Sequence, residues 1–125
     1  MQIAIGLIVN KQNEILIAKR EFGKHLGGFW EFPGGKLEPG EESFSGLQRE
    51  LQEEVGIEIQ RGLTPWMRLQ HDYGDRLVDL DFYLVREFSG SVRAVEGQEI
   101  CWVKVEHLDK YEFPAANQPV IVALQ

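Results

Sequence analysis

A group of carboxylates on one predicted helix has the clearest capacity for chemistry in this sequence. At about 100° per residue, Glu50, Glu53 and Glu54 fall on one arc, and a rise of about 1.5 Å per residue keeps them within roughly 6 Å along the axis. Glu41, at or just before the helix start, can add a fourth oxygen ligand. Hard oxygen donors of this kind select Mg²⁺ or Mn²⁺. The spacing predicts a divalent-metal site.

An acidic helix face is more often solvated surface than a site, so this alternative has to be weighed. Two observations favour a site. Arg49 is the only basic residue in the helix, so like charges at i, i+3 and i+4 each cost a few tenths of a kcal/mol if nothing binds them. The turn before the helix also contains Gly34 and Gly35, where a backbone can approach a ligand closely.

The helix itself is predicted from its packing arc and its end signals. Ser43 is a reasonable N-cap, and Gly56 is a natural left-handed stop. Gly46 weakens the helix interior by about 1 kcal/mol relative to Ala, so we expect the backbone of a neighbouring strand to approach there. The arc that packs against the rest of the protein consists of Phe44, Leu47, Leu51 and Val55.

The first part of the chain predicts a hairpin. Apolar runs at residues 3–9 and 14–18 are separated by the turn-like residues 10–13. Residues 21–30 contain three glycines and are expected to form a long loop.

The second part of the chain predicts three more strands and a short helix. Residues 63–72 and 77–86 read as strands, and the second is expected to be half-buried because its apolar and polar residues alternate. Residues 100–105 read as the last strand, and Asn117 and Pro119 mark the start of a helix. Strands interleaved with helical segments and hairpins predict an α/β fold with a mixed β-sheet between helices.

Composition narrows the class of protein. A chain of 125 residues is expected to form a single domain over residues 1–125. Cys101 is the only cysteine, which excludes an internal disulfide, and its apolar neighbours indicate a buried strand thiol. The net charge of −7 disfavours long nucleic acid as a partner. No basic leader or membrane-spanning run is seen, so we expect a cytoplasmic protein without a membrane partner.

The central stretch resembles the signature of the Nudix family, G-x5-E-x7-R-E-U-x-E-E-x-G-U, in which U is aliphatic. This sequence fills every defined position without a gap, with Gly35, Glu41, Arg49, Glu50, Leu51, Glu53, Glu54, Gly56 and Ile57. The resemblance implies the Nudix fold, an α/β/α sandwich. It also implies divalent-metal-dependent hydrolysis of a nucleoside diphosphate linked to another group.

Two further segments are similar to the MutT branch of this family, whose members cleave 8-oxo-dGTP to the monophosphate and pyrophosphate. They are residues 31–36, EFPGGK, and residues 113–121, FPAANQPVI. The match is plausible from Gln2 through Leu124. Gln118 departs from the pattern, because a MutT relative carries an acid there, and this bears on base selectivity.

The resemblance also implies roles for individual residues. Glu50, Glu53 and Glu54 match metal-binding and water-activating carboxylates, the carbonyl of Gly34 matches a backbone metal ligand, and Glu96 matches a distal carboxylate of the metal site. Arg49 would orient the glutamates. The positions that match nucleotide-binding residues are Arg20 on the phosphate side and Phe32, Arg76 and Asn117 in the base pocket.

The residues and the resemblance together lead to one leading hypothesis for the function and to several alternatives. The leading hypothesis is a Mg²⁺-dependent pyrophosphohydrolase, with Mn²⁺ as a substitute, that acts as a monomer on 8-oxo-dGTP. Asn117 could read a purine edge with its amide or could simply cap a helix. The alternatives are a Nudix enzyme for CTP or a modified pyrimidine triphosphate, and a non-catalytic nucleotide-binding module. A structural Ca²⁺ domain is disfavoured because the ligands lie on a helix rather than in a loop.

Overall fold

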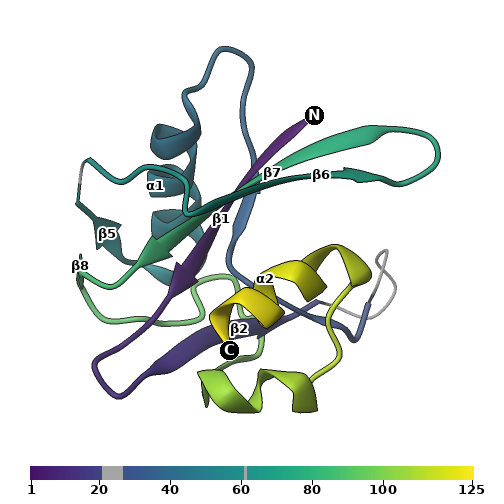
Figure 1. The fold of residues 1–125 in the computed structure, drawn as a ribbon. Helices are drawn as coiled ribbons and strands as arrows, with labels where there is room; N and C mark the ends of the chain where they lie inside the picture. The colour runs from purple at the N-terminus through teal and green to yellow at the C-terminus, as the bar shows by residue number, and fades with distance from the viewer. Residues whose placement is uncertain (21–26, 61) are drawn as a thin grey trace.

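The computed structural model describes residues 1–20, 27–60 and 62–125, and in this part of the chain β-sheets lie between helical layers (Figure 1). Alternating and continuous apolar runs form the strands, and the 3.6-residue period forms the main helix. The elements in chain order are β1 Gln2–Ile8, β2 Glu14–Lys19, β3 Trp30–Glu31, β4 Gly34–Lys36, α1 Ser43–Val55, β5 Glu58–Ile59, β6 Met67–Asp72, β7 Leu77–Val85, β8 Phe88–Ser89, β9 Ile100–Lys104, the 3₁₀ helices η1 Val105–Lys110 and η2 Ala115–Asn117, and α2 Gln118–Leu124.

The predicted mixed sheet is confirmed. Among the described residues, a four-stranded sheet has the order β4-β1-β7-β6, in which β1 and β7 are parallel and the other pairs are antiparallel. A three-stranded antiparallel sheet has the order β3-β2-β9, and β5 pairs with β8. Strand β1 is apolar along most of its length because side chains on both of its faces are buried.

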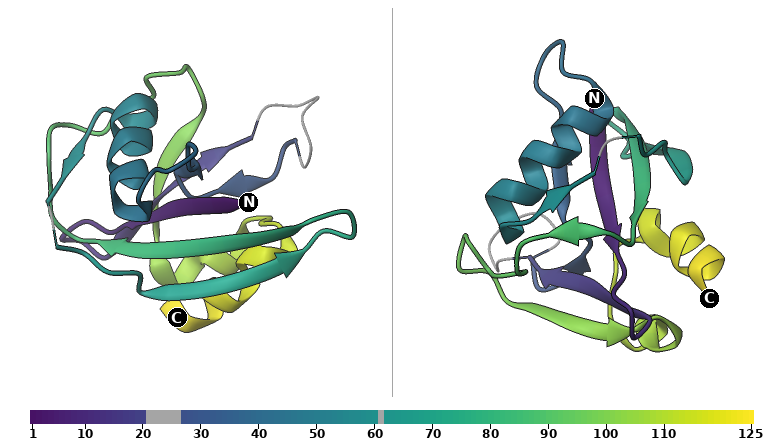
Figure 2. Two further views of the ribbon diagram at one scale, coloured as in Figure 1. Left: turned by 90° about the horizontal axis from the view of Figure 1, so that it is seen from above. Right: turned by 90° about the vertical axis from the view of Figure 1, so that its left-hand side faces the viewer.

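The helices cover opposite sides of the strands, as Figure 2 shows in its right-hand view. Leu47, Leu51 and Val55 of α1 are fully buried in one hydrophobic cluster with Ala4 and Ile8 of β1. A second cluster lies between the two larger sheets and includes residues of η1 and α2. The expected α/β/α arrangement is therefore confirmed, and α1 is held by its apolar arc with its acidic arc turned away from the core.

Two strand predictions were wrong in part. The expected hairpin of β1 and β2 is reduced to a single antiparallel bridge between Val9 and Ile15, because β1 pairs along its whole length with β7 and β2 belongs to the other sheet. Strand β7 is not half-buried: Asp81 and Tyr83 are buried like Phe82 on the opposite face, because α1 covers the face that they occupy. The expected loop at residues 21–30 falls partly outside the described residues; residues 27–28 form a turn, and β3 begins at Trp30.

Two details of α1 also differ from the prediction. Glu42, not Ser43, is the N-cap, and the Ser43 hydroxyl instead donates a 2.8 Å hydrogen bond to Asp81. The space beside Gly46 is filled by the side chains of Leu37 and Glu41 rather than by a strand backbone. The predicted stop is confirmed, because Gly56 has φ 72° and ψ 25°.

Helix α2 begins after Asn117, as predicted, and has a proline in its first turn. The strand expected at residues 63–72 begins only at Met67. Cys101 lies in β9, as predicted, but it is partly buried rather than buried, and this partial burial is the main cause that raises the pKa of its thiol. Within the described ranges, no helix is both long enough and apolar enough to cross a membrane.

Candidate functional site

Glu54 is the most strongly perturbed carboxylate on the acidic face of α1. Its Oε2 accepts a 3.1 Å hydrogen bond from the backbone N–H of Gly34, which ties the helix to the start of β4. Burial raises the pKa of Glu54 to about 8, and the negative charges of Glu50, Glu31 and Glu96 act in the same direction. Among the predicted metal residues, Gly34 thus bonds Glu54 directly, and Glu50 and Glu96 lie near enough for their charges to act on it.

Glu50 packs against the glycine turn. A Cβ on Gly35 would lie 2.6 Å from the Glu50 carboxylate, so only glycine leaves room for this side chain. Burial is the main cause that raises the pKa of Glu50, and Glu53 and Glu96 raise it further. The adjacent glycines that the sequence singled out thus allow the backbone to approach a carboxylate of the helix.

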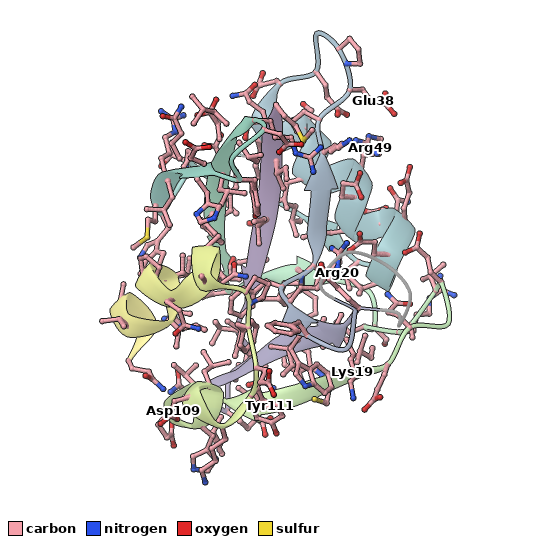
Figure 3. The ribbon with its side chains drawn as sticks, turned by 90° about the vertical axis from the view of Figure 1, so that its right-hand side faces the viewer. Lys19, Arg20, Glu38, Arg49, Asp109 and Tyr111 are labelled. Atoms are coloured by element: carbon pink, nitrogen blue, oxygen red, sulfur yellow. The ribbon has the colours of Figure 1, made fainter. Side chains whose placement is uncertain are left out.

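Arg49 connects the flanking loop to the acidic face. Figure 3 shows its side chain beside Glu38, and their Nε and Oε1 atoms are 3.7 Å apart. Its Nη1 donates to Glu50 at 2.9 Å and to Glu53 at 3.4 Å. Because Arg49 contacts two of the three helix carboxylates, the predicted orienting role has a direct geometric basis.

Glu41 lies just before α1, as the sequence predicts, and its carboxylate binds Arg49. Both of its oxygens accept 2.9 Å hydrogen bonds from Arg49, through Nε and Nη2. These bonds hold the pKa of Glu41 at about 2. Glu41 is thus the main partner of Arg49, and its role as a fourth metal ligand stays a prediction.

A small cavity of about 170 Å³ joins the C-terminal part of α1 to the segment before β9. Glu54 and Glu96 line it together with Arg20, Glu31 and Gln98. Sequence reasoning did not single out Gln98, although it follows Glu96 after one glycine. Glu53 lines neither this cavity nor the larger one described next, and its side chain is 56% exposed.

A larger cavity of about 300 Å³ shares Arg20 and Glu31 with the small one and is lined by all four predicted nucleotide residues. The lining of this cavity includes residues from four separate parts of the chain, namely Arg20, Phe32, Arg76 and Asn117. Phe32 is buried and stacks on Phe113 with ring centroids 4.9 Å apart. The aliphatic side of the cavity, which the sequence did not identify, consists of Ile3, Ile5, Val78 and Leu80.

Asn117 has a polar group facing this cavity rather than a helix-capping role. It precedes α2, but its side chain makes no capping hydrogen bond. Of the two roles left open by the sequence, capping is therefore not the one that the structure shows. Its amide keeps a donor and an acceptor for a ligand.

The acidic cluster fits a hard divalent cation in its donor chemistry. Carboxylate oxygens and a peptide carbonyl are the ligands that such ions prefer, and the pKa of Glu54 is raised first by burial and then by the neighbouring negative charges of Glu50, Glu31 and Glu96. In the ranges 1–20, 27–60 and 62–125, no three acidic, histidine or cysteine side chains converge closely enough to form a ready-made metal cluster. In the described structure, Arg49 occupies oxygens of Glu50 and Glu53.

Comparison with known proteins agrees with this geometry. Residues 4–123 match the NUDIX domain family. The 8-oxo-dGTP diphosphatase of Escherichia coli K12 is 42% identical over 100% of this chain and 96% of its own length. The CTP pyrophosphohydrolase of the same organism is 34% identical over 95% of this chain and 87% of its own length.

A solved structure of MutT, from work on the Aliivibrio salmonicida and Vibrio cholerae proteins, has the same fold. It superposes with a TM-score of 0.86 at 41% identity and covers 99% of this chain and 97% of that one. The family match spans nearly the whole sequence, and the acidic helix, the glycine turn, the small cavity and most of the lining of the larger cavity lie within it. This chain belongs to the Nudix family.

Proposed function

We propose that this protein is a nucleoside triphosphate pyrophosphohydrolase that converts 8-oxo-dGTP to 8-oxo-dGMP and pyrophosphate, and so removes a mutagenic nucleotide from the pool. The observation that carries the proposal is the pair of adjoining cavities. One contains Phe32 and Asn117, the other contains Glu54 and Glu96, and Arg20 lines both. A nucleotide could place its base in the first cavity and its phosphates beside the acidic helix.

Divalent metal ions are general among Nudix hydrolases, and we propose Mg²⁺, with Mn²⁺ as a substitute, for this chain. The metal would be held by the carboxylates of Glu50, Glu53, Glu54 and Glu96 and by the carbonyl of Gly34. When bound, the metal supplies charge neutralisation for phosphate oxygens and lowers the pKa of water.

The chain's own residues supply the remaining chemistry. Glu53 or Glu50 accepts the proton of the attacking water, and Arg49 holds both carboxylates in place through its Nη1. Attack at the β-phosphorus would release pyrophosphate. Phosphoryl transfer depends mainly on positioning and on charge stabilisation, which fits a site built from fixed carboxylates and arginines.

Base recognition is assigned to the larger cavity. Phe32 offers an aromatic surface, and Arg76 adds a positive charge at the mouth. The Asn117 amide can both donate and accept, so it can pair with O6 and with the N7 hydrogen that 8-oxo-guanine has gained. Arg20 lies on the phosphate side because it also lines the acidic cavity.

A substrate panel tests the proposal. Purified protein with Mg²⁺ is given 8-oxo-dGTP, dGTP and CTP, and pyrophosphate release is measured for each. We expect the highest kcat/KM for 8-oxo-dGTP. Equal rates on all three nucleotides would overturn the 8-oxo assignment, and nucleotide binding without hydrolysis would instead indicate a binding module.

CTP is the second candidate substrate because a relative that is 34% identical is a CTP pyrophosphohydrolase. The 8-oxo-dGTP diphosphatase relative is more similar, at 42% identity, and the Asn117 amide suits a purine edge. A preference for CTP in the panel would select this alternative.

We also propose that residues 1–125 form one Nudix domain that works as a cytoplasmic monomer on free nucleotides. The net charge of −7 supports a small substrate that binds together with a cation, because long polyanions would be repelled.

A further inference from the structure

The segment that carries Glu96 is fastened to the C-terminal end of α1. Backbone N–H groups of Val95 and Arg93 donate 3.1 Å hydrogen bonds to the carbonyls of Glu54 and Val55, respectively. The last carbonyls of a helix have no partner within the helix itself. This segment therefore completes the helix end and at the same time brings Glu96 next to it.

Gln98 makes a second connection with both ends of its side-chain amide. Its Oε1 accepts a 3.1 Å hydrogen bond from the backbone N–H of Glu96. Its Nε2 donates a 3.0 Å hydrogen bond to the carbonyl of Glu54. The half-buried side chain lines the 170 Å³ cavity together with both glutamates. One amide thus links the backbones of two predicted metal ligands that are far apart in sequence.

This link matters because Glu96 itself lies in an exposed turn. Its main chain leads directly into Gly97, whose φ of 77° only glycine adopts readily. An exposed carboxylate on such a turn has many accessible orientations, and fixing its backbone removes part of that freedom before any ligand arrives.

We propose that Gln98 is a positioning residue that sets Glu96 against Glu50 and Glu54 and thereby completes the cation site. The inference rests on the proposed function, because it takes Glu96 to be a metal ligand. Residues behind metal ligands typically change metal affinity or activity about 10- to 100-fold when they are replaced.

The test uses Gln98→Met, which keeps the length of the side chain and removes both hydrogen bonds. Mn²⁺ affinity of the nucleotide-free protein, measured by electron paramagnetic resonance, is expected to fall about tenfold. The Mg²⁺ concentration for half-maximal hydrolysis should rise in parallel. The control is Gln12→Met, at an exposed turn residue whose side chain contacts neither cavity; it should leave both values unchanged.

A double-mutant cycle with Glu96→Gln separates positioning from a general structural effect. If Gln98 acts through Glu96, adding Gln98→Met to Glu96→Gln should produce no further loss of Mn²⁺ affinity. Full additivity would overturn the inference, and so would wild-type affinity in Gln98→Met. Wild-type affinity in Glu96→Gln would overturn the metal role of Glu96 as well, which identifies a failure of the proposed function.

One measurement on the unaltered protein keeps the inference testable if Gln98→Met does not fold. The amide proton of Glu96 should exchange slowly with solvent because Gln98 accepts its hydrogen bond. Exchange at the rate of an unprotected exposed amide would overturn the inference.

Discussion

Arg49 divides the carboxylates around α1 into two groups with different charge states. Glu41 receives two of its hydrogen bonds and has a pKa of about 2, so it stays ionised. Among the described residues, Glu54 accepts a hydrogen bond from the backbone N–H of Gly34 and none from Arg49, and burial raises its pKa to about 8. The charge of Arg49 is thus directed to Glu41, Glu50 and Glu53.

Glu53 is expected to be essential for turnover and dispensable for folding. Its side chain is 56% exposed and accepts a 3.4 Å hydrogen bond from Arg49, so Glu53→Gln should leave the melting temperature nearly unchanged. Loss of a catalytic proton acceptor or metal ligand should lower kcat by about 10²- to 10⁴-fold. Steady-state hydrolysis and thermal unfolding measure the two effects.

The matched control for this prediction is Glu42→Gln, the same charge change at an exposed residue that makes no capping hydrogen bond. It should keep wild-type activity. Retained turnover in Glu53→Gln would remove Glu53 from the mechanism and leave Glu50 as the candidate base.

Glu54 should make the metal-free protein less stable as the pH rises. Its pKa is about 8 in the folded protein against 4.5 ordinarily, so between these values the folded state binds a proton that the unfolded state has lost. The stabilisation is complete below about pH 4.5 and is lost as the pH rises to about 8, with a slope of at most about 1.4 kcal/mol per pH unit.

Urea unfolding of the chelator-treated protein at about pH 6, 7 and 8 measures this slope. Glu54→Gln should flatten it, because an amide has no proton to lose, and added Mg²⁺ should stabilise the wild type most at the highest pH. Identical slopes in wild type and variant would contradict the assignment.

At the scale of elements, α1 is fastened at both ends as well as along its apolar face. At its start, Tyr83 donates a 2.9 Å hydrogen bond to Ser43, which donates in turn to Asp81. Asp81 and Tyr83 lie in β7 and are 7% and 2% exposed. The acidic face therefore sits on a helix whose first turn is held by a buried polar chain, and this limits how far its carboxylates can shift along the sheet.

Asp81→Ala should destabilise the fold by about 1–3 kcal/mol, because it removes the acceptor of the Ser43 hydroxyl, to which Tyr83 in turn donates. Asp79→Ala is the matched control on the same strand, since the Asp79 carboxylate accepts a 3.0 Å hydrogen bond from Gln70 near the surface and its loss should cost less than about 0.5 kcal/mol. Denaturant unfolding of both variants gives the comparison. Equal losses would show that the buried chain does not stabilise α1.

Local pattern predicted α1 well because its apolar period and its stop at Gly56 are encoded within the helix itself. Ser43 was misassigned because an N-cap preference is weak compared with a buried hydrogen bond to Asp81 on a distant strand. The predicted hairpin of β1 and β2 was wrong for the same reason. Proximity in sequence favours pairing of β1 with β2, but β1 instead pairs in a long parallel register with β7.

At the scale of the whole molecule, the site is an arrangement of segments that no single stretch encodes. The resemblance to the Nudix family nominated Arg20, Phe32, Arg76 and Asn117 one by one, and the fold places all four around one cavity. Glu31, which lines both cavities, and Gln98, which links two backbones, were missed because their importance comes from contacts between distant segments. The types of residue in the sequence predict which chemistry is available, whereas the fold decides which of these residues line the same cavity.

Asn117 offers the sharpest test of this arrangement, because it is far from the acidic helix in sequence and should affect choice of base rather than hydrolysis. In Asn117→Ala, kcat/KM for 8-oxo-dGTP relative to dGTP should fall about 10- to 100-fold, as expected for loss of a paired donor and acceptor on a base edge. The change should appear mainly in KM, since Glu53 and Arg49 are untouched.

Gln118→Ala is the control that distinguishes the cavity from its surroundings. Gln118 carries the same amide group one residue later, but it is exposed and does not line the cavity. It should keep the wild-type preference. If both variants lost selectivity equally, the effect would come from the start of α2 as a whole; if only Gln118→Ala lost it, the departure from the MutT pattern at this position would be what sets the base. Selective loss in Asn117→Ala alone would tie base choice to the cavity that the fold assembles.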